Sequence, residues 1–235
     1  MKKRTFASLL FIFLRLSWLS AAIGDWTTHN SYRYATNCRI IGDKVFVLSG
    51  GNLYSYNKND GELLVYDHIN GLSDVKVAYI EYSKAIDALV VVYENANIDL
   101  LYDDETIYNI SDFKNKILAD KKINNLQVSD SMAYISTSFG IVELNLKRRE
   151  FGNTYTINQN VNSVALYDGC FFACTSAGLY RGSIADNLLD NKNWTKLYGK
   201  SITAIGEYGG KLYAVLPDLG FYSVSIEGEG VTLAP

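Results

Sequence analysis

The sequence predicts an all-β protein, a β-propeller of about five blade-like repeats of ~42 residues each. Three observations predict this fold class. Five apolar runs of β-type residues recur at near-even spacing, and each is followed by an Asn or Gly and then by a second apolar run. Tyr occurs 18 times whereas Pro and Met occur twice each, a composition typical of strands. A repeat of about 40–45 residues built from short strands has the length of a propeller blade.

The equivalent positions of the repeat are Phe46, Val91, Tyr134, Phe172 and Tyr213. They are separated by 45, 43, 38 and 41 residues, a mean of about 42. A helical repeat of similar length would show a 3.6-residue apolar period, and these segments do not. Five units either close a five-bladed ring or belong to a larger one. We expect a seven-bladed ring of which this chain supplies part.

One position of the repeat, the turn slot, contains only Asn or Gly. It lies six residues after the equivalent position in four copies and seven in the fifth, where Pro217 and its neighbours lengthen the turn. The slot residues are Asn52, Asn97, Gly140, Gly178 and Gly220. Because Asn and Gly tolerate positive φ at low cost, we expect a left-handed residue at this slot in every hairpin.

Two segments depart from the repeat. Between Ser111 and Leu118, Ile110, Phe113 and Ile117 fall near one face behind a possible Ser111 cap, which favours a helix of one or two turns; an irregular loop fits equally well. A strand-like element around residues 26–34 has no full repeat to join. In closed propellers such a strand commonly completes the last blade.

The many Tyr residues have two interpretations. They fit strand propensity and core packing, which we favour. The alternative is that exposed Tyr rings form a platform on which sugars stack, and the sequence does not say which Tyr are exposed.

Residues 1–24 read as a secretory signal peptide, which leaves residues 25–235 as the propeller domain. A basic start, Lys2 to Arg4, precedes an apolar stretch that contains Arg15, and small residues permit cleavage after Gly24 or after Ala22. The apolar stretch is shorter than the ~20 residues that a membrane span needs. We therefore expect an exported protein without a transmembrane span.

The net charge disfavours nucleic acid as a partner. Without the four basic residues of the signal segment, 18 Lys and Arg face 25 Asp and Glu, a net charge near −7. Such a balance also disfavours a polybasic membrane-binding surface. The short basic run Lys147-Arg148-Arg149 is best interpreted as a solvated strand end or turn.

The sequence offers no catalytic residue, metal ligand or cofactor site. The three cysteines, Cys38, Cys170 and Cys174, are an odd number, and Cys170 and Cys174 lie too far apart along one strand for a bridge. We expect buried free thiols that act as small apolar residues. The two His are far apart in sequence, and no nucleophile, zincin or P-loop motif occurs. The ligand-binding residues stay unknown.

Two polar segments are better explained by structure than by chemistry. Asp103-Asp104-Glu105 lacks the alternating oxygen ligands of a calcium loop, so we expect a solvated turn. Asn70-Gly71-Leu72-Ser73-Asp74 looks like a turn before a strand, in which Ser73 or Asp74 bonds local backbone amides.

Taken in order, several segments resemble the N-terminal propeller of the PorZ family, which belongs to the type IX secretion system of Bacteroidota. The segments that carry the resemblance are Trp26–His29, Ile69–Asp74, Val90–Tyr93, Asn95–Leu101, Ile107–Asp112, Ile123–Asn125, Ser136–Val142 and Leu146–Glu150. Each is a weak motif alone, but their order and spacing span essentially the whole chain after residue 24.

The resemblance implies a non-catalytic binding and scaffold domain at the outer membrane, in the periplasm or at the cell surface. Family members carry a second propeller and a C-terminal sorting domain, neither of which this sequence contains. They work with a sortase-like protease and an outer-membrane shuttle protein in a complex that attaches exported cargo to anionic lipopolysaccharide. The resemblance therefore implies these protein partners, and lipopolysaccharide or another glycan as a ligand.

Two other readings stay open at this point. A periplasmic glycan-sensing propeller of a hybrid two-component regulator shares the blade type, and would carry a transmembrane helix and a kinase after its propellers. A propeller enzyme acting on polysaccharide would need an acidic pair in the central channel, which only the fold could bring together. No feature of the sequence favours the enzyme.

Overall fold

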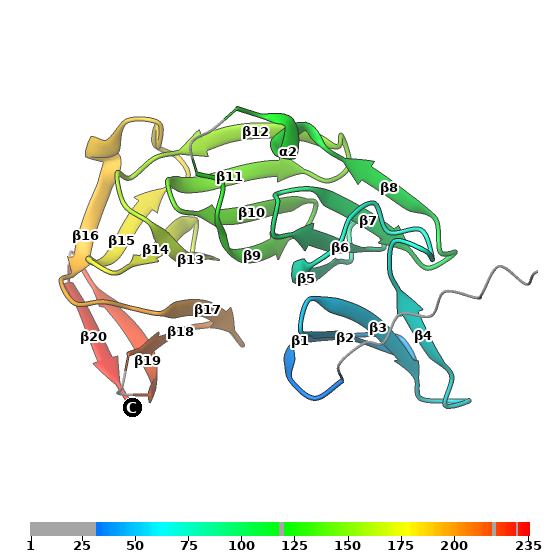
Figure 1. The fold of residues 1–235 in the computed structure, drawn as a ribbon. Helices are drawn as coiled ribbons and strands as arrows, with labels where there is room; N and C mark the ends of the chain where they lie inside the picture. The colour runs from blue at the N-terminus through cyan, green and yellow to red at the C-terminus, as the bar shows by residue number, and fades with distance from the viewer. Residues whose placement is uncertain (1–31, 118–119, 218–219, 229) are drawn as a thin grey trace, which may run out of the picture. The chain divides into compact units, whose positions relative to one another are not determined.

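The computed structural model describes residues 32–117, 120–217, 220–228 and 230–235, which form five four-stranded antiparallel sheets (Figure 1). In every sheet the strands pair in chain order. The predicted all-β propeller with five blades is therefore confirmed. The blades are β1 Ala35–Ile41, β2 Lys44–Ser49, β3 Asn52–Asn57 and β4 Leu63–Tyr66; β5 Val77–Ser83, β6 Ala88–Tyr93, β7 Ile98–Tyr102 and β8 Ile107–Ile110; β9 Ile123–Ser129, β10 Met132–Thr137, β11 Gly140–Asn145 and β12 Glu150–Tyr155; β13 Val161–Tyr167, β14 Cys170–Thr175, β15 Gly178–Ser183 and β16 Trp194–Tyr198; β17 Ala204–Tyr208, β18 Lys211–Leu216, β19 Gly220–Glu227 and β20 Gly230–Ala234.

Strand β6 shows why these runs form blades. All six of its residues are buried. Because side chains alternate along a strand, Val90 and Val92 pack in one core cluster with blade 3, whereas Leu89, Val91 and Tyr93 pack in another with blade 1. An unbroken apolar run is the pattern expected of a strand that is buried on both faces.

Within the described residues the core consists of four clusters, one between each pair of successive blades. The cluster of blades 3 and 4 is aromatic: the rings of Tyr134 and Phe171 meet edge to face with centroids 4.9 Å apart, and Trp194 lies over Phe171 at 6.5 Å. The cluster of blades 4 and 5 is mostly aliphatic. Each interface thus buries the apolar faces of two blades.

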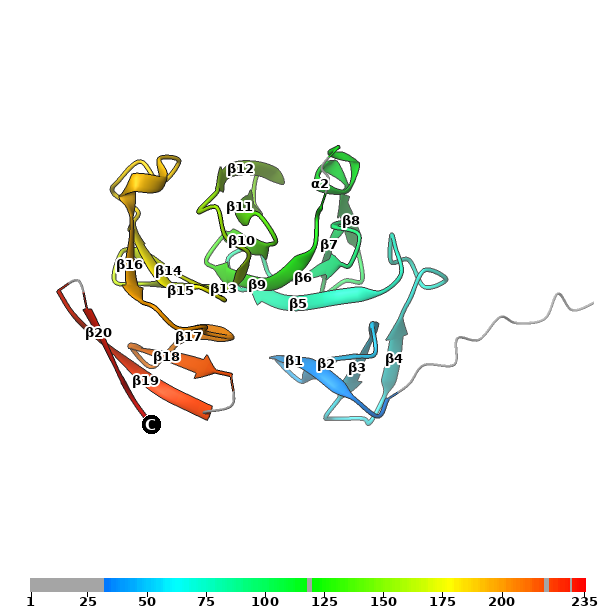
Figure 2. The same ribbon diagram turned by 60° about the vertical axis from the view of Figure 1, so that its left-hand side comes forward.

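The first strands of the blades, β1, β5, β9, β13 and β17, contact one another in sequence (Figure 2). In the first four, a register shift near the strand start marks a β-bulge. Polar side chains near these bulges donate hydrogen bonds to carbonyl oxygens of the next blade. The bonds run from Asn37 to Ile80, from Tyr79 to Asn124, from Asn124 to Val161 and from Asn162 to Ile202.

The turn-slot prediction holds for the three glycines and is wrong for the two asparagines. Gly140, Gly178 and Gly220 have positive φ, whereas in blades 1 and 2 the left-handed residue is the preceding one, Gly51 with φ 81° and Ala96 with φ 67°. In those two hairpins the positive φ falls one residue earlier, although Asn52 begins β3 just as Gly140 begins β11.

Gly140 and Gly178 are needed for a second reason, the close approach of backbone. A Cβ on Gly140 would lie 2.1 Å from the carbonyl oxygen of Tyr155, and one on Gly178 would lie 1.9 Å from that of Tyr198. In both turns the hydroxyl of a buried threonine, Thr137 in one and Thr175 in the other, donates to the glycine carbonyl, at 2.9 and 3.0 Å.

The predicted helix exists as a single turn, α2, at Asp112–Asn115, with Ser111 at the N-cap position but no side-chain capping bond. Ile110 and Phe113 are buried as expected, but Ile117 is 99% exposed, so its place on the apolar face was wrong; the backbone turns extended at Lys116, before Ile117. The part of the chain that the structure describes also contains a 3₁₀ turn, η1, at Asn191–Asn193. The element expected at residues 26–34 and the signal segment 1–24 lie outside the described residues, apart from residues 32–34.

All three cysteines are free, as predicted, but only one is a core residue. Cys174 is buried, and burial raises the pKa of its thiol to about 11 although hydrogen bonds with Ser163 oppose the shift. Cys170 is half-buried and Cys38 is exposed. The expectation of buried thiols is therefore wrong for Cys38, because alternate side chains of β1 point away from blade 2.

The outward faces of blades 1 and 5 are apolar and uncovered among the described residues. On blade 1, strand register aligns Ile40, Val45, Tyr56 and Leu63 across the sheet, and three of them are 45–66% exposed. The outward face of blade 5 carries the stacked rings of Tyr213 and Phe221, with centroids 5.1 Å apart and Phe221 62% exposed. Apolar faces of this kind mark contact surfaces.

Replacing Gly140 or Gly178 with Ala will destabilise the fold by about 1–3 kcal/mol, because the new Cβ meets backbone at a positive φ. Urea unfolding followed by circular dichroism measures the change. The matched control is Gly206→Ala, since Gly206 has open space around its Cβ and no positive φ. Equal midpoints for all three variants would contradict the role of these two turns.

Candidate functional site

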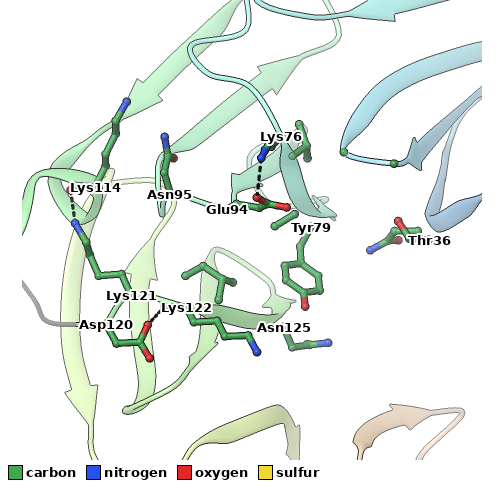
Figure 3. A pocket seen from close by; sticks show the side chains of 16 residues that line it. Thr36, Lys76, Tyr79, Glu94, Asn95, Lys114, Asp120, Lys121, Lys122 and Asn125 are labelled. Carbon is green, nitrogen blue, oxygen red and sulfur yellow. Dashed lines mark hydrogen bonds and ion pairs between the residues drawn. The ribbon is translucent and has the colours of Figure 1, made fainter. Parts of the chain in front are cut away.

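A cleft of about 1160 Å³ opens where the starts of β1, β5 and β9 meet (Figure 3). Residues of three blades line it: Thr36 from blade 1, Tyr79 from blade 2 and Asn125 from blade 3. The turn after β6 contributes Glu94 and Asn95, and the segment that follows β8 contributes lysines. The cleft therefore exists only because successive blades place the starts of their first strands side by side.

Four lysines line this cleft: Lys76, Lys114, Lys121 and Lys122. The ammonium of Lys76 lies 4.0 Å from the carboxylate of Glu94, and both side chains are more than half exposed. Exposed pairs of this kind contribute little to stability. The ammonium of Lys121 donates to the carbonyl oxygens of Lys114, in α2, and Lys116, at its C-cap, at 2.5 and 2.9 Å.

Asp74 connects the loop before β5 to the cleft wall. Its Oδ2 accepts hydrogen bonds from the side chains of Lys114 and Asn95, both at 2.6 Å, and its Oδ1 accepts one from the amide of Val75 at 3.1 Å. Burial by itself would raise the pKa of Asp74, but these hydrogen bonds and the nearby Lys114 charge outweigh it and lower the pKa to about 2. The carboxylate is thus held ionised.

Asp99, fully buried on β7, organises the same loop from behind. It accepts hydrogen bonds from the amide of Ser73 at 2.8 Å, from the side chain of Asn109 at 2.8 Å and from the hydroxyl of Tyr93. Burial, and then the bond to Asp99, raise the pKa of Tyr93 far above its ordinary value. A buried carboxylate with several donors is stable where an unpaired one would not be.

This network confirms and extends the structural role predicted for Asn70–Asp74. Asp74 bonds a local amide as expected, and the two carboxylates additionally hold the loop against β7 and α2. This second role could not be predicted from the sequence, because Asp74 and Lys114 lie 40 residues apart.

The other polar segments singled out in the sequence lie away from the cleft. Asp103–Glu105 forms the solvated turn between β7 and β8, as predicted, where Asp103 pairs with Lys44 at 3.2 Å. Lys147–Arg149 is an exposed turn before β12, also as predicted. Arg149 reaches back to blade 2, where its guanidinium lies 3.8 Å from the centre of the Tyr108 ring.

The tyrosines serve mainly the core and the blade interfaces. Tyr66, Tyr93, Tyr134 and Tyr155 are buried, whereas Tyr34 and Tyr208 are exposed at 76% and 80%. In the cleft, Tyr79 is half-buried. A single half-buried ring differs from the broad stacking platform considered from the sequence.

Within the part of the chain that the structure describes, His, Cys, Asp and Glu side chains form no group of three or more suited to a metal ion. In the same part of the chain, no helix has the length and apolar character needed to cross a membrane.

The fold and the sequence comparisons together define the class of this protein: a β-propeller domain of a bacterial secretion component. The sequence profile described as the PorZ N-terminal β-propeller domain of the type IX secretion system matches residues 45–195. The chain belongs to this family.

A solved structure agrees with this assignment. It is PorZ, described as an essential bacterial surface component of the type IX secretion system of Porphyromonas gingivalis. It shares 30% sequence identity over 89% of this chain, with a TM-score of 0.78. The chain spans 29% of the length of that PorZ structure. No curated protein matches this chain.

Two further solved structures are similar in fold alone. They are extracellular domains from B. thetaiotaomicron, described as parts of a putative one-component system and a putative hybrid two-component system. Their TM-scores are 0.63 and 0.60, at 18% and 15% identity. The two matches cover 85% and 88% of this chain, but 28% and 29% of the similar structures. Propellers of sensors and secretion proteins thus share blade architecture.

Asp74→Asn will remove one acid-dependent component of stability. The folded-state pKa of Asp74 is about 2, below its ordinary value of 3.8, so the ionised carboxylate stabilises the fold above about pH 4 and this contribution is lost as the pH falls toward 2. Urea midpoints measured from pH 6 to pH 2 will decline less steeply for the variant than for the unmodified protein. Asp104→Asn is unsuitable as a control because hydrogen bonds also lower the pKa of Asp104; Asp186→Asn, at an exposed turn, serves instead. Parallel curves for the unmodified protein and Asp74→Asn would contradict the stabilising role of the ionised Asp74 carboxylate.

Proposed function

We propose that this chain is a non-catalytic binding and scaffold propeller of the type IX secretion attachment complex at the bacterial outer membrane. The observation that carries the proposal is membership of the PorZ N-terminal propeller family, supported by the PorZ structure that is similar over 89% of the chain. The proposed protein partners are a sortase-like protease and an outer-membrane shuttle protein. Rigid blades suit such a role because they display loops of varied sequence on a stable frame.

The proposed ligand of the domain is lipopolysaccharide or another glycan. The cleft at the starts of β1, β5 and β9 supports this part of the proposal, since it combines lysines with amide and hydroxyl side chains of three blades. Binding by such a cleft needs no catalytic group. The proposal therefore places the domain in presenting lipopolysaccharide to the attachment complex, not in cleaving or joining it.

Export and completion of the ring belong to the same proposal. The basic and apolar composition of residues 1–24 supports secretion across the inner membrane, and the location proposed is the periplasm or the cell surface. The apolar outward faces of blades 1 and 5 support a larger ring, seven-bladed as expected from the sequence, in which further blades cover them.

Removing this domain from the protein in its native cells tests the proposed function. Cargo proteins are expected to lose their surface attachment, which proteomics of shaved cell surfaces measures, while their transcript levels stay unchanged. A variant that carries Lys192→Gln, an exposed position on η1, is the matched control and should retain attachment.

The glycan-sensing regulator predicts the opposite pattern in this experiment. Its only structural support is fold similarity at 15–18% identity. Unchanged cargo attachment together with a lost transcriptional response to polysaccharide would contradict the secretion role and favour the sensor.

Residues 25–235, produced alone, will self-associate through the apolar outward faces of blades 1 and 5. Light scattering after size-exclusion chromatography should show a mass that rises with concentration. Ile40→Lys combined with Phe221→Lys should shift the population to monomer, because both side chains are exposed. Exposed Ile184 on the turn after β15 provides the control Ile184→Lys, which should leave association unchanged. A concentration-independent monomer before any substitution would contradict the covering of these faces in the larger ring.

A further inference from the structure

The charge of the cleft is opposite to that of the chain. The sequence has a formal net charge of −3, yet the described residues that line the cleft include four lysines and two carboxylates, Glu94 and Asp120. A cleft lined mainly by one sign of charge raises the local concentration of ions of the other sign. Its occupant is therefore expected to be an anion.

The four lysines are not equally available. Lys114 is neutralised by Asp74, with 2.6 Å between nitrogen and oxygen, and belongs to the cleft wall. Among the described residues, the ammonium of Lys76 has only the long, exposed pair with Glu94. The ammonium groups that remain for a ligand are those of Lys76, Lys121 and Lys122.

Lys121 supplies a fixed positive charge. Two of its three ammonium hydrogens are used by the carbonyl oxygens of Lys114 and Lys116, which hold the group in place without neutralising it. A donor that is already immobilised loses little conformational entropy when a ligand binds. With respect to the residues that the structure describes, one ammonium hydrogen is left for an anionic oxygen.

Lys122 has no ion-pair or hydrogen-bond partner for its ammonium group among the described residues, although its backbone amide donates to Asp120 at 2.9 Å. In Figure 3 its side chain points toward Asn125 and Tyr79, which lie on the strands β9 and β5. Asp120 lowers the net charge at the rim, but Lys121 and Lys122 together exceed it by one positive charge.

Neutral polar groups continue the cleft beyond the lysines. The side-chain amide of Asn125 has no hydrogen-bond partner among the described residues, so its donors and its acceptor are both available. The half-buried ring of Tyr79 lies next to it in the cleft, with its hydroxyl bonded to a backbone carbonyl of blade 3. An amide beside an aromatic ring suits hydroxyl groups and the apolar face of a sugar.

We propose that this cleft binds an anionic saccharide, with its phosphate or carboxylate on Lys76, Lys121 and Lys122 and its sugar ring against Asn125 and Tyr79. The inference rests on the proposed function and deepens it, since it assigns residues to a binding role and names the charged group that is recognised. Asp74 and Lys114 act as positioning residues because they hold the wall of the cleft and touch no ligand.

Calorimetric titration of the protein tests the site with four probes: glucose 6-phosphate, glucose, inorganic phosphate and trigalacturonate. We expect binding of glucose 6-phosphate, trigalacturonate or both, and no binding of glucose. The double variant Lys76→Gln/Lys122→Gln should weaken this binding about tenfold, as loss of charge-assisted hydrogen bonds predicts. Asn125→Ala should weaken the binding of the saccharides without affecting the binding of inorganic phosphate. Lys192→Gln should leave the affinity for every probe unchanged.

The two anionic sugars distinguish a phosphate site from a carboxylate site, and either result supports the proposal. Inorganic phosphate binding as tightly as both sugars would overturn the saccharide part. Equal affinity of the double variant and the unmodified protein would overturn the site.

Vesicles of phosphatidylcholine that contain the cell's own lipopolysaccharide separate this inference from the proposed function. Weaker binding of these vesicles by the double variant supports the site. If the unmodified protein and the double variant bind them equally, the proposed function stands and the site assignment fails. If the unmodified protein binds neither the vesicles nor any soluble probe, both the site and the glycan-binding role fail.

Discussion

The structure depends on one constraint, that a blade with two apolar faces is stable only when a neighbouring blade covers each face. Strand β6 is buried along its whole length because Val90 and Val92 face blade 3 while Leu89 and Val91 face blade 1. Hydrophobic burial of this kind is the main stabilising term in folding. The hydrogen bonds between first strands, such as that from Asn124 to Val161, are directional, and they fix how each blade meets the next.

The same constraint creates the cleft. Successive blades bring the bulged starts of β1, β5 and β9 together, and the segment after α2 then adds Lys121 and Lys122 at the rim. The ionised Asp74 and the buried Asp99 keep the neighbouring loop and α2 in place. The packed blades thus bring charged side chains from separate parts of the chain to one site. The chain belongs to a propeller family of the type IX secretion system.

Much of the fold could be predicted from the sequence, because strand period, repeat length and turn glycines are local signals. The five repeats are of this kind, whereas near Ser111 the sequence fitted a short helix and an irregular loop equally well. Asn52 and Asn97 misled the turn prediction because the left-handed residue precedes them, a shift that composition does not reveal. The cleft could not be predicted at all. Thr36, Lys76 and Lys122 lie tens of residues apart, and only the packing of three blades brings them to one site. The prediction that Cys38 is buried was wrong for a similar reason, since the exposure of its side chain depends on what covers blade 1.

Hydrogen–deuterium exchange, resolved strand by strand on residues 25–235 with the monomer-favouring changes Ile40→Lys and Phe221→Lys, tests the mutual support of the blades most directly. The amides of β6, β10 and β14, which lie in blades with neighbours on both sides, should exchange slowest and at a common rate, because exposing any of them requires two interfaces to open. The amides of β2 and β18, each covered on one face among the described residues, should exchange faster. Equal protection of all five central strands would mean that each blade is stable by itself, and would contradict the account.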